Sequence, residues 1–334
     1  MVKKQISISI TGAAGFIGSH LLKRLILENF KIGLILDSFN PSYGGMWCTH
    51  RQNFLVPEVE ILNINLLEES ASSLALKLDS TDVVVHFAAF PGVRQGELES
   101  NKFLINNVNS AGIVLDAIAL NKNIKAIIFA SSSSVYGDIG LMNPSKEIEA
   151  NGSQIKSNYA MTKWINEIQF SFRQKKLNIP VFALRFFTVF GRWGRPDMAY
   201  STFTHGILKD APISIFGVDG GQRAMTHIED AVELVVRLIC LLKDSEFDSK
   251  IGFQSFNIAS GNSISALEMA QTISRVAGRD PKFVFSERPY GDSLATSADL
   301  TKINKFVKPL KKRDLTQDIE NYVEWHIENK SLFS

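Results

Sequence analysis

Residues 6–20 read ISISITGAAGFIGSH, and this stretch predicts a strand, a tight loop and the start of a helix. Three alternate isoleucines, beginning with Ile6, favour a β-strand. Ile17, Leu21 and Leu25 then follow at the spacing of one helix face. The stretch therefore predicts a strand, loop and helix of the kind from which α/β folds are built.

The loop carries three glycines at intervals of three residues, Gly12, Gly15 and Gly18. In dinucleotide-binding folds the first such glycine permits a tight turn, the second lets the backbone approach a pyrophosphate, and the third lets the helix pack closely. The amino terminus of the helix adds free N–H groups and the positive end of a dipole. Because a glycine-rich turn in any α/β protein has a similar composition, the spacing alone does not decide the function.

Asp37 ends the next apolar run, residues 32–36, and follows Gly18 by nineteen residues. A second parallel strand would put its carboxylate beside a ribose, where it accepts hydrogen bonds from the 2′-OH and repels a 2′-phosphate. The alternative is an aspartate that begins a turn with Ser38 and Asn40. In that case the nineteen-residue spacing from Gly18 would be a coincidence. We therefore expect NAD rather than NADP.

The composition excludes several classes of partner. The 334 residues suffice for about two domains, and 36 basic against 34 acidic residues leave a net charge of +2, which favours neither nucleic acid nor an anionic membrane. Two cysteines and six scattered histidines show no ligand spacing, so we expect no metal and no disulfide. With no signal-peptide pattern and no apolar run of the ~18 residues that a membrane span needs, we expect a soluble, cytoplasmic protein.

Strands and helices alternate along the first part of the chain. Apolar runs predict strands at residues 59–62, 82–87, 126–130 and 181–184, and periodicity predicts helices at residues 105–120 and 159–174. This order predicts an α/β fold, a Rossmann-type doubly wound, mainly parallel sheet with helices on both faces. Residues 38–51 have no period and are rich in Gly, Ser and aromatic residues, which predicts a loop.

The pattern changes after residue 184, where loops lengthen and helical patterns shorten. We place an NAD-binding domain at residues 1–184 and a smaller C-terminal lobe, mainly for the substrate, at residues 185–334. Residues 255–258 and 283–285 have the pattern of short strands that could return to the first domain. The basic run at residues 311–313 is interpreted as a solvated face.

Tyr159 and Lys163 lie four residues apart in a predicted helix, so they share one face. A phenol titrates near ~10 in water, and a nearby positive charge lowers that pKa, so Tyr159 could accept a proton from a hydroxyl group. Residues 131–134 are four serines at the end of the strand at 126–130, where they could hydrogen-bond the reacting oxygen. An ordinary pair of side chains on a helix surface and a polar loop at a strand end explain each pattern singly, but their order after the glycine loop favours an active site.

The chain resembles the extended short-chain dehydrogenase/reductase family, and within it the nucleotide-sugar 4-epimerases. The resemblance covers essentially the whole chain, through TGAAGFIGSH, HFAAFPGVR, SSSSVYG, YAMTK, LRFFTVFGRWGRPDMA, RAMTHIED and PYGDSLATSAD. It is closest to UDP-glucuronate 4-epimerases, whose hallmark R-F-F-T-V-Y-G-P-W-G-R-P-D-M differs from residues 185–198 only at Phe190 and Arg192.

The resemblance implies 4-epimerisation of a UDP-sugar, closest to conversion of UDP-glucuronate to UDP-galacturonate, with tightly held NAD and a 4-keto intermediate. Tyr159 would take the proton of the 4-OH, Lys163 would also hold the nicotinamide ribose, and Ser132 would bridge Tyr159 and the substrate. The cofactor residues would be Gly12, Gly15, Phe16, Ile17, Gly18, Asp37, Asn63, Ile64, Phe87, Ala88, Ala89, Tyr159 and Lys163. The substrate residues would be Arg94, Ser133, Ser134, Thr188, Arg195, Arg223, Arg288 and Asp292.

Within that set, Thr188 and Arg195 match positions near the sugar carboxylate, which a guanidinium binds as a planar fork. Arg223, Arg288 and Asp292 match the site of the diphosphate and ribose. The resemblance also implies a homodimer that is formed through a helix bundle.

Some positions depart from the family pattern. Asn63 stands where an aspartate usually faces the adenine, Ala224 and His227 replace an aspartate and a tyrosine, and the segment after Asp37 is unlike the usual one. These differences leave NAD binding intact as an expectation, but they leave the sugar and the nucleotide open.

Three other functions are alternatives. A dehydratase or decarboxylase starts with the same oxidation but commonly carries a carboxylate where this chain has Ser133 and Ser134. A 4-epimerase for a neutral UDP-hexose or an N-acetylhexosamine is a second alternative. A non-enzymatic NAD-binding sensor or scaffold is the third, and such proteins usually lose the Tyr or the Lys.

Overall fold

The computed structural model describes residues 5–40, 45–138, 143–288 and 295–333. The chain begins with β1 (Ser7–Thr11), α1 (Phe16–Leu27) and β2 (Lys31–Asp37), in which β1 and β2 pair in parallel. This is the strand–loop–helix–strand unit that the opening stretch predicts.

Seven parallel strands form the main sheet in the order β10-β6-β5-β4-β1-β2-β3. The five strands not yet defined are β3 (Leu62–Asn63), β4 (Val83–His86), β5 (Ala126–Ser132), β6 (Val181–Phe186) and β10 (Phe253–Ile258). The strand order reverses beside β1, where β2 lies on one side and β4 on the other. This parallel sheet confirms the predicted fold class. Ligands of doubly wound folds bind at the carboxyl ends of the strands at such a reversal.

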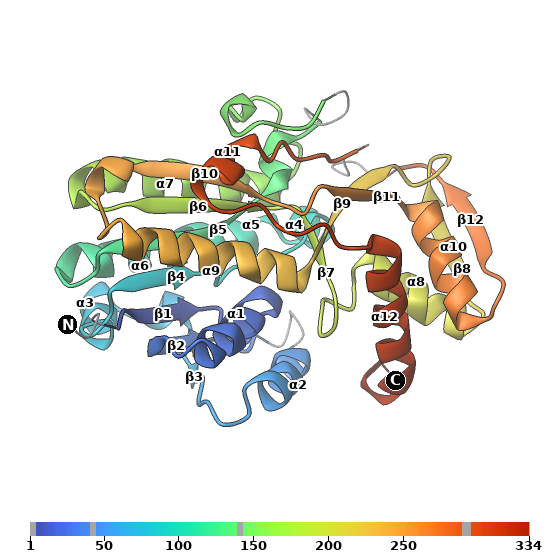
Figure 1. Cartoon of the computed structure of the whole chain (residues 1–334), viewed down its shortest axis with the longest axis horizontal. Helices are drawn as coiled ribbons and strands as arrows, with labels where there is room; N and C mark the ends of the chain where they lie inside the picture. Colours follow the sequence, from blue (N-terminus) through green and yellow to red (C-terminus); the bar gives the residue numbers. More distant parts are fainter. Residues whose placement is uncertain (1–4, 41–44, 139–142, 289–294, 334) are drawn as a thin grey trace.

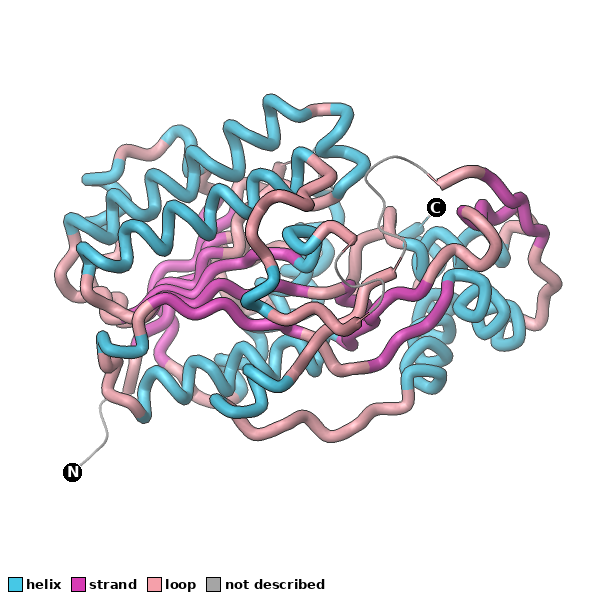
Figure 2. The backbone as a smooth tube through the Cα atoms, turned by 90° about the horizontal axis from the view of Figure 1, so that it is seen from above, coloured by secondary structure: helices cyan, strands magenta, loops and turns pink. Residues whose placement is uncertain are grey.

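Helices cover both faces of this sheet (Figures 1 and 2). The residues of β4 alternate, because Val83 and Val85 pack with α1 and α9 (Ile228–Asp244), whereas Val84 packs on the opposite face. That opposite face is covered by α3 (Ala71–Lys77), α6 (Ser110–Leu120) and α7 (Asn158–Leu177). Strands buried on both sides explain the continuous apolar runs in the sequence.

The second lobe lies beyond the carboxyl ends of the strands (Figure 1). Its core is formed by α8 (Ala199–Leu208), β8 (Pro212–Phe216), α10 (Ala266–Ala277) and α12 (Leu315–Glu328), and β12 (Lys282–Ser286) pairs with β8. A three-stranded sheet connects it to the first lobe and consists of β7 (Thr188–Phe190), β9 (Gln222–His227) and β11 (Asn262–Ser265).

Three predicted segments differ from the structure. Residues 255–258 do join the first sheet, as part of β10, but residues 283–285 lie in β12 and pair with β8 instead. The third strand starts at Leu62, later than expected, and pairs with β2 through only two residues. The segment predicted as a loop at residues 38–51 contains most of helix α2 (Gly45–Leu55), which is stabilised by tertiary contacts that local periodicity does not reveal.

Within the described residues, one helical stretch is long and apolar enough to cross a membrane, contrary to our expectation from the sequence. This stretch, Ser100–Leu120, contains an 18-residue segment with a mean hydropathy of 1.5, and 44% of that segment is buried. It comprises α5 (Ser100–Leu104), a π-helical turn (Ile105–Asn109) and α6. Ala111, Val114 and Leu115 pack on the sheet, so the core accounts for much of its apolar character.

Candidate functional site

The glycine loop joins β1 to α1 at the reversal point of the sheet. Gly12 has a φ of +74°, and a side chain there would meet the backbone of Ala88 at 2.5 Å. A side chain at Gly18 would meet the Gly12 carbonyl oxygen at 2.1 Å, so only glycine lets α1 begin this close to the loop. The first turn of α1 has no side-chain cap and no acidic residue. Its N–H groups therefore suit an anion, such as a pyrophosphate.

Asp37 lies at the end of β2 and supports the same loop. Its Oδ2 accepts a hydrogen bond from the Ala14 N–H at 3.0 Å, and its Oδ1 accepts one from the Phe39 N–H at 2.9 Å. Burial raises the pKa of Asp37, and the two backbone donors oppose that rise. Asn63 pairs with Asp37 across the neighbouring strands, and the Ile64 N–H donates to the Asp37 carbonyl at 2.8 Å. Asp37, Asn63 and Ile64 therefore lie together at the ends of β2 and β3, where the sequence predicts contacts with a nucleoside.

The end of β4 closes the other side of the glycine loop. The Phe87 N–H donates to the Thr11 carbonyl at 2.9 Å, and the Ala88 N–H donates to the Thr11 hydroxyl at 3.3 Å. Ala88 and Ala89 are half-buried and small, so they leave room for a flat ligand. Phe16 and Ile17, also half-buried, stand in the first turn of α1.

Tyr159 and Lys163 occupy one face of α7, near its amino terminus. The Ser157 hydroxyl caps the helix by accepting a hydrogen bond from the Ala160 N–H, so Tyr159 lies in the first turn. The positive end of the helix dipole favours a negative charge at that point. The Lys163 Nζ is 5.8 Å from the centre of the Tyr159 ring and donates to the Ala130 carbonyl at 2.9 Å.

The electrostatics of this pair differ from the sequence-based expectation. Burial raises the pKa of Tyr159, while a hydrogen bond with Ser132 and the charge of Arg195 act in the opposite direction. Burial also lowers the pKa of Lys163 to about 8. The expected lowering of the tyrosine pKa by Lys163 is therefore wrong for the protein alone, because removal from water disfavours both the phenolate and the ammonium.

The serine row continues from β5 into a short 3₁₀ turn (Ser133–Tyr136). Ser132 accepts a hydrogen bond from the Ser134 N–H at 3.1 Å, and its hydroxyl lies 3.1 Å from the Ser134 hydroxyl. Ser133 and Ser134 are half-buried, whereas Ser131 points into the protein. Of this row, Ser132 forms a side-chain hydrogen bond with Tyr159.

A buried ion pair holds the serine row and α7 together. Arg185 donates to both carboxylate oxygens of Glu167, from Nε at 2.9 Å and from Nη2 at 2.7 Å. The Ser131 hydroxyl donates to Glu167 Oε1 at 2.5 Å. Glu167 lies one turn after Lys163 on α7, and Arg185 lies on β6, so this pair fixes the helix against the ends of two strands.

Arg195 reaches the same region from the loop that follows β7. Its guanidinium would contact a side chain at Gly92 at 2.9 Å, and its charge acts on Tyr159. It donates to both carboxylate oxygens of Asp197, and the side chains of Arg195 and Asp197 are 26% and 62% exposed. The guanidinium near Tyr159 is therefore held by a partner that water can reach.

The other predicted substrate residues are more dispersed. Thr188 is half-buried at the start of β7, and Arg223, on β9, donates to the Gln222 carbonyl at 3.2 Å. Arg94 lies on α4 (Val93–Leu98) with its guanidinium 4.9 Å from the centre of the Phe216 ring. Arg288 approaches Gly217, the next residue after Phe216, so two guanidinium groups approach the end of β8. Asp292 lies outside the described residues.

Sequence reasoning missed four residues around the site: Trp47, Arg51, Glu167 and Asp197. The spacing of Lys163 and Glu167 on α7 was a signal, since residues four apart share a helix face. Trp47 and Arg51 have the same spacing in α2, but the absence of a regular apolar pattern concealed the helix.

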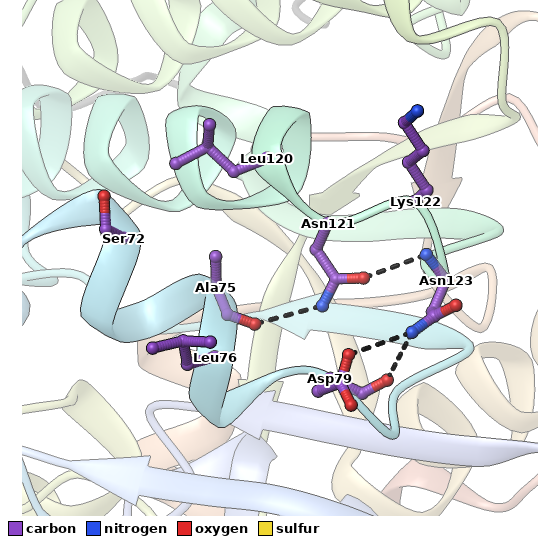
Figure 3. A pocket seen from close by; sticks show the side chains of 8 residues that line it. All are labelled: Ser72, Ala75, Leu76, Asp79, Leu120, Asn121, Lys122 and Asn123. Atoms are coloured by element: carbon purple, nitrogen blue, oxygen red, sulfur yellow. Dashed lines mark hydrogen bonds between the residues drawn. The ribbon is translucent and has the colours of Figure 1, made fainter.

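A groove lies elsewhere on the first lobe. It has a volume of about 470 Å³ and runs between the end of α3 and the end of α6, with Leu76, Asp79 and Leu120 in its lining (Figure 3). These helix ends lead into β4 and β5, so the groove opens at the amino ends of the strands, opposite the glycine loop. It takes no part in the site described here.

In the described residues, no group of His, Cys, Asp and Glu side chains could hold a metal ion, and Cys48 and Cys240 are free thiols.

Comparisons with known proteins agree with this geometry. The sequence model of the "NAD dependent epimerase/dehydratase family" matches residues 8–258. A protein of Rhizobium meliloti named "Probable UDP-glucuronate 4-epimerase" is 30% identical, over 96% of this chain and 96% of its own. The UDP-glucuronic acid 4-epimerase of Bacillus cereus, solved with UDP-glucuronic acid and NAD, superposes with a TM-score of 0.85 at 28% identity and covers 97% of this chain and 99% of its own.

A third relative acts on a different sugar. The UDP-N-acetylglucosamine 4-epimerase of Methanobrevibacter ruminantium, solved with UDP-N-acetylmuramic acid, has a TM-score of 0.82 and 26% identity, over 97% of this chain and 99% of its own. Similarity at this level identifies the fold and the reaction family, and it leaves the sugar to be argued from the site.

Proposed function

Since the chain belongs to the NAD dependent epimerase/dehydratase family and to its NAD-dependent UDP-sugar 4-epimerases, we propose that its substrate is UDP-glucuronate, which it converts to UDP-galacturonate. The observation that carries this proposal is Arg195, whose guanidinium lies against Gly92 and acts on Tyr159. A guanidinium is the group best suited to a carboxylate in a closed site, because it binds both oxygens. The relatives from Rhizobium and Bacillus, named for the uronate, support the same choice.

The glycine loop, Asp37 and Lys163 are the residues we expect to hold NAD. The loop fits a pyrophosphate because Gly12 and Gly18 leave no space for side chains and the first turn of α1 carries no acidic group. When bound, NAD supplies the hydride acceptor for carbon 4 of the sugar and the donor that reduces the same carbon again. Asp37 favours the free 2′-OH of NAD over the 2′-phosphate of NADP.

Tyr159 is the proposed acceptor of the 4-OH proton, and Ser132 relays or orients that proton. Because burial raises the tyrosine pKa, the phenolate requires positive charge nearby, which the start of α7, Arg195 and the protonated form of Lys163 provide. Removal of the 4-OH proton, together with transfer of the carbon-4 hydride to NAD when it is bound, would give a 4-keto sugar. Return of the hydride to the opposite face of carbon 4, and of the proton to the oxygen, would complete the epimerisation.

The arrangement of carboxylates favours epimerisation over elimination or decarboxylation, which need a further acid or base near the sugar. Glu167 lies near the serine row, but Arg185 and Ser131 occupy both of its oxygens. Ser133 and Ser134 carry no charge. The 4-keto intermediate is therefore expected to be reduced again. Tyr159 and Lys163 are both retained, which argues against a silent NAD-binding scaffold.

Arg195→Ala tests the uronate directly. Loss of a charge-assisted, bidentate contact should reduce kcat/KM on UDP-glucuronate by roughly ten- to a hundredfold and leave UDP-glucose much less affected. Asp197→Asn is the matched control, since it removes the negative charge of the partner of Arg195 and keeps the guanidinium. If Arg195 only holds its own loop, both variants should lose activity on both substrates, and that result would contradict the proposal.

We further propose that the active form is a homodimer in the cytoplasm. Apolar side chains are exposed on α5, the π-helical turn and α7, helices that contact one another, with Ile168 54% and Phe172 74% exposed. Leu104 and Ile105 are exposed beside them. Light scattering should give the mass of two chains, and Phe172→Glu should give one. A wild-type monomer would contradict this proposal without affecting the assignment of the substrate.

The two lobes have different proposed roles. We propose that residues 1–184 bind NAD, that residues 185–334 mainly bind the nucleotide sugar, and that β10 and α9 belong structurally to the first lobe. Arg94 and Arg288, which approach the end of β8, suit the diphosphate of the substrate.

A further inference from the structure

Helix α2 lies between the glycine loop and the second lobe (Figure 1). Its residues Trp47 and Arg51 are one turn apart and are 7% and 3% exposed. Trp47 belongs to the core of the second lobe, where its ring lies 5.7 Å from that of Trp193 and 5.1 Å from that of Phe333. A helix that follows β2 in the first lobe therefore inserts its buried face into the second.

Arg51 connects two loops through one guanidinium. Its Nη1 donates to the Ala14 carbonyl at 2.8 Å, and its Nε donates to the Trp193 carbonyl at 2.7 Å. Ala14 is in the glycine loop, and its N–H is the group that Asp37 holds. Trp193 is in the loop that carries Arg195. The planar, rigid guanidinium fixes the separation of these two carbonyls, whereas a lysine would reach only one of them.

Trp47 holds the second loop at a neighbouring point. Its Nε1 donates to the Gly194 carbonyl at 2.7 Å, and Gly194 immediately precedes Arg195. The two side chains of α2 thus bond two consecutive carbonyls in the loop before Arg195. A displacement of α2 would move both the glycine loop and the backbone that aims Arg195.

The charge of Arg51 adds a second effect. No carboxylate in the described ranges forms an ion pair with Arg51; its Nη1 lies 3.5 Å from the Cys48 sulfur, and the charge of Asp37 acts on it from a distance. A buried cation is costly unless negative charge is nearby. An anion at the glycine loop would supply such charge, so Arg51 should favour binding of a pyrophosphate there.

We propose that Arg51 and Trp47 are positioning residues that hold the glycine loop and the Arg195 loop in register, so that the NAD site and the sugar site are set together. The expected effect on the sugar site rests on the role proposed above for Arg195. The expected effect on NAD binding rests on the glycine loop alone.

Four variants test the coupling: Arg51→Met, Arg51→Lys, Trp47→Phe and the control Gln52→Ala. Gln52 lies on α2 and donates to the Val59 carbonyl, so its variant loses a hydrogen bond of α2 without touching either loop. The measurements are the Kd for NAD, the KM and kcat for the best UDP-sugar of the wild type, and the melting temperature.

Arg51→Met should weaken NAD binding and raise the sugar KM together, each by roughly ten- to a hundredfold, and Arg51→Lys should lie between it and the wild type. Trp47→Phe keeps the aromatic packing but loses one neutral hydrogen bond, so it should raise the sugar KM by about two- to tenfold and leave the NAD Kd unchanged. Gln52→Ala should change neither constant.

The inference is overturned if Arg51→Met lowers only the melting temperature, or if Gln52→Ala reproduces its effects. It is also overturned if Trp47→Phe weakens NAD as much as the sugar. If Arg51→Met does not fold, Arg51→Lys and Trp47→Phe still decide the outcome. A wild type that prefers another UDP-sugar would contradict the uronate proposal, while the coupled losses remain measurable on that sugar.

Discussion

Glu167→Gln removes one negative charge from the buried ion pair behind the serine row. The side chains of Arg185 and Glu167 are 3% and 5% exposed, so water cannot replace the lost partner. The new amide keeps one oxygen for Arg185 or Ser131, but its NH₂ group must face a donor of the guanidinium. The charge of Arg185 then stays buried without a counter-charge.

The expected loss of stability is large because the damage is an unpaired charge rather than a missing contact. Removing one partner of a buried pair typically costs about 3–5 kcal/mol, whereas an exposed pair contributes about 0–1 kcal/mol. Turnover should fall as well, since Glu167 anchors Ser131 next to Ser132 and lies one turn beyond Lys163.

Urea denaturation followed by circular dichroism measures the first effect, and Glu233→Gln is the matched control. Glu233 accepts hydrogen bonds from Arg24 and Arg237, each at 2.8 Å, but its side chain is 26% exposed. The control should lose less than about 1 kcal/mol. Similar losses in the two variants would refute our reasoning on the buried pair.

Three further predictions concern the site and the pH dependence. Tyr159→Phe should lower kcat by a factor of at least ~10² with little change in the affinity for the nucleotide sugar, and near-normal turnover would exclude Tyr159 as the proton acceptor. Asp37→Asn keeps an acceptor for the Ala14 N–H but loses the charge. The preference for NAD over NADP should therefore fall by about tenfold or more. A wild type that binds NAD and NADP with equal affinity would contradict the role of Asp37. Burial lowers the pKa of His20 to about 4, so between pH 6.5 and 4 the unfolded chain binds a proton that the native chain does not. Stability should therefore decrease as the pH falls through that window, by about 2 kcal/mol at pH 5 from this residue. In His20→Gln the difference between melts at pH 7 and pH 5 should be smaller than in the wild type, and an unchanged difference would argue against a neutral histidine at this position.

Much of the first lobe could be predicted from the sequence because its signals are local. The glycine spacing, the position of Asp37 and the apolar runs each depend on a few neighbouring residues, and the parallel sheet follows from their order. The helix that carries Tyr159 was predictable for the same reason.

The remaining errors share a physical cause, which is dependence on tertiary contacts. Helix α2 is held by Trp47 and Arg51 against backbone carbonyls far along the chain, and no local pattern reveals those partners. Burial raises the pKa of Tyr159, opposed by Ser132 and Arg195, so the spacing of Tyr159 and Lys163 alone gave the wrong direction. Residues 283–285 have the composition of a strand, but composition does not say which sheet a strand joins.

The uronate assignment is tested by comparing UDP-glucuronate, UDP-glucose and UDP-N-acetylglucosamine as substrates of the purified protein. Products would be separated by chromatography and identified by proton NMR and mass spectrometry. We expect UDP-galacturonate of unchanged mass, no accumulation of NADH, and a kcat/KM for the uronate at least ~10-fold above that for either neutral sugar. A preference for UDP-glucose would contradict the uronate assignment, and loss of water or carbon dioxide as the main outcome would contradict epimerisation.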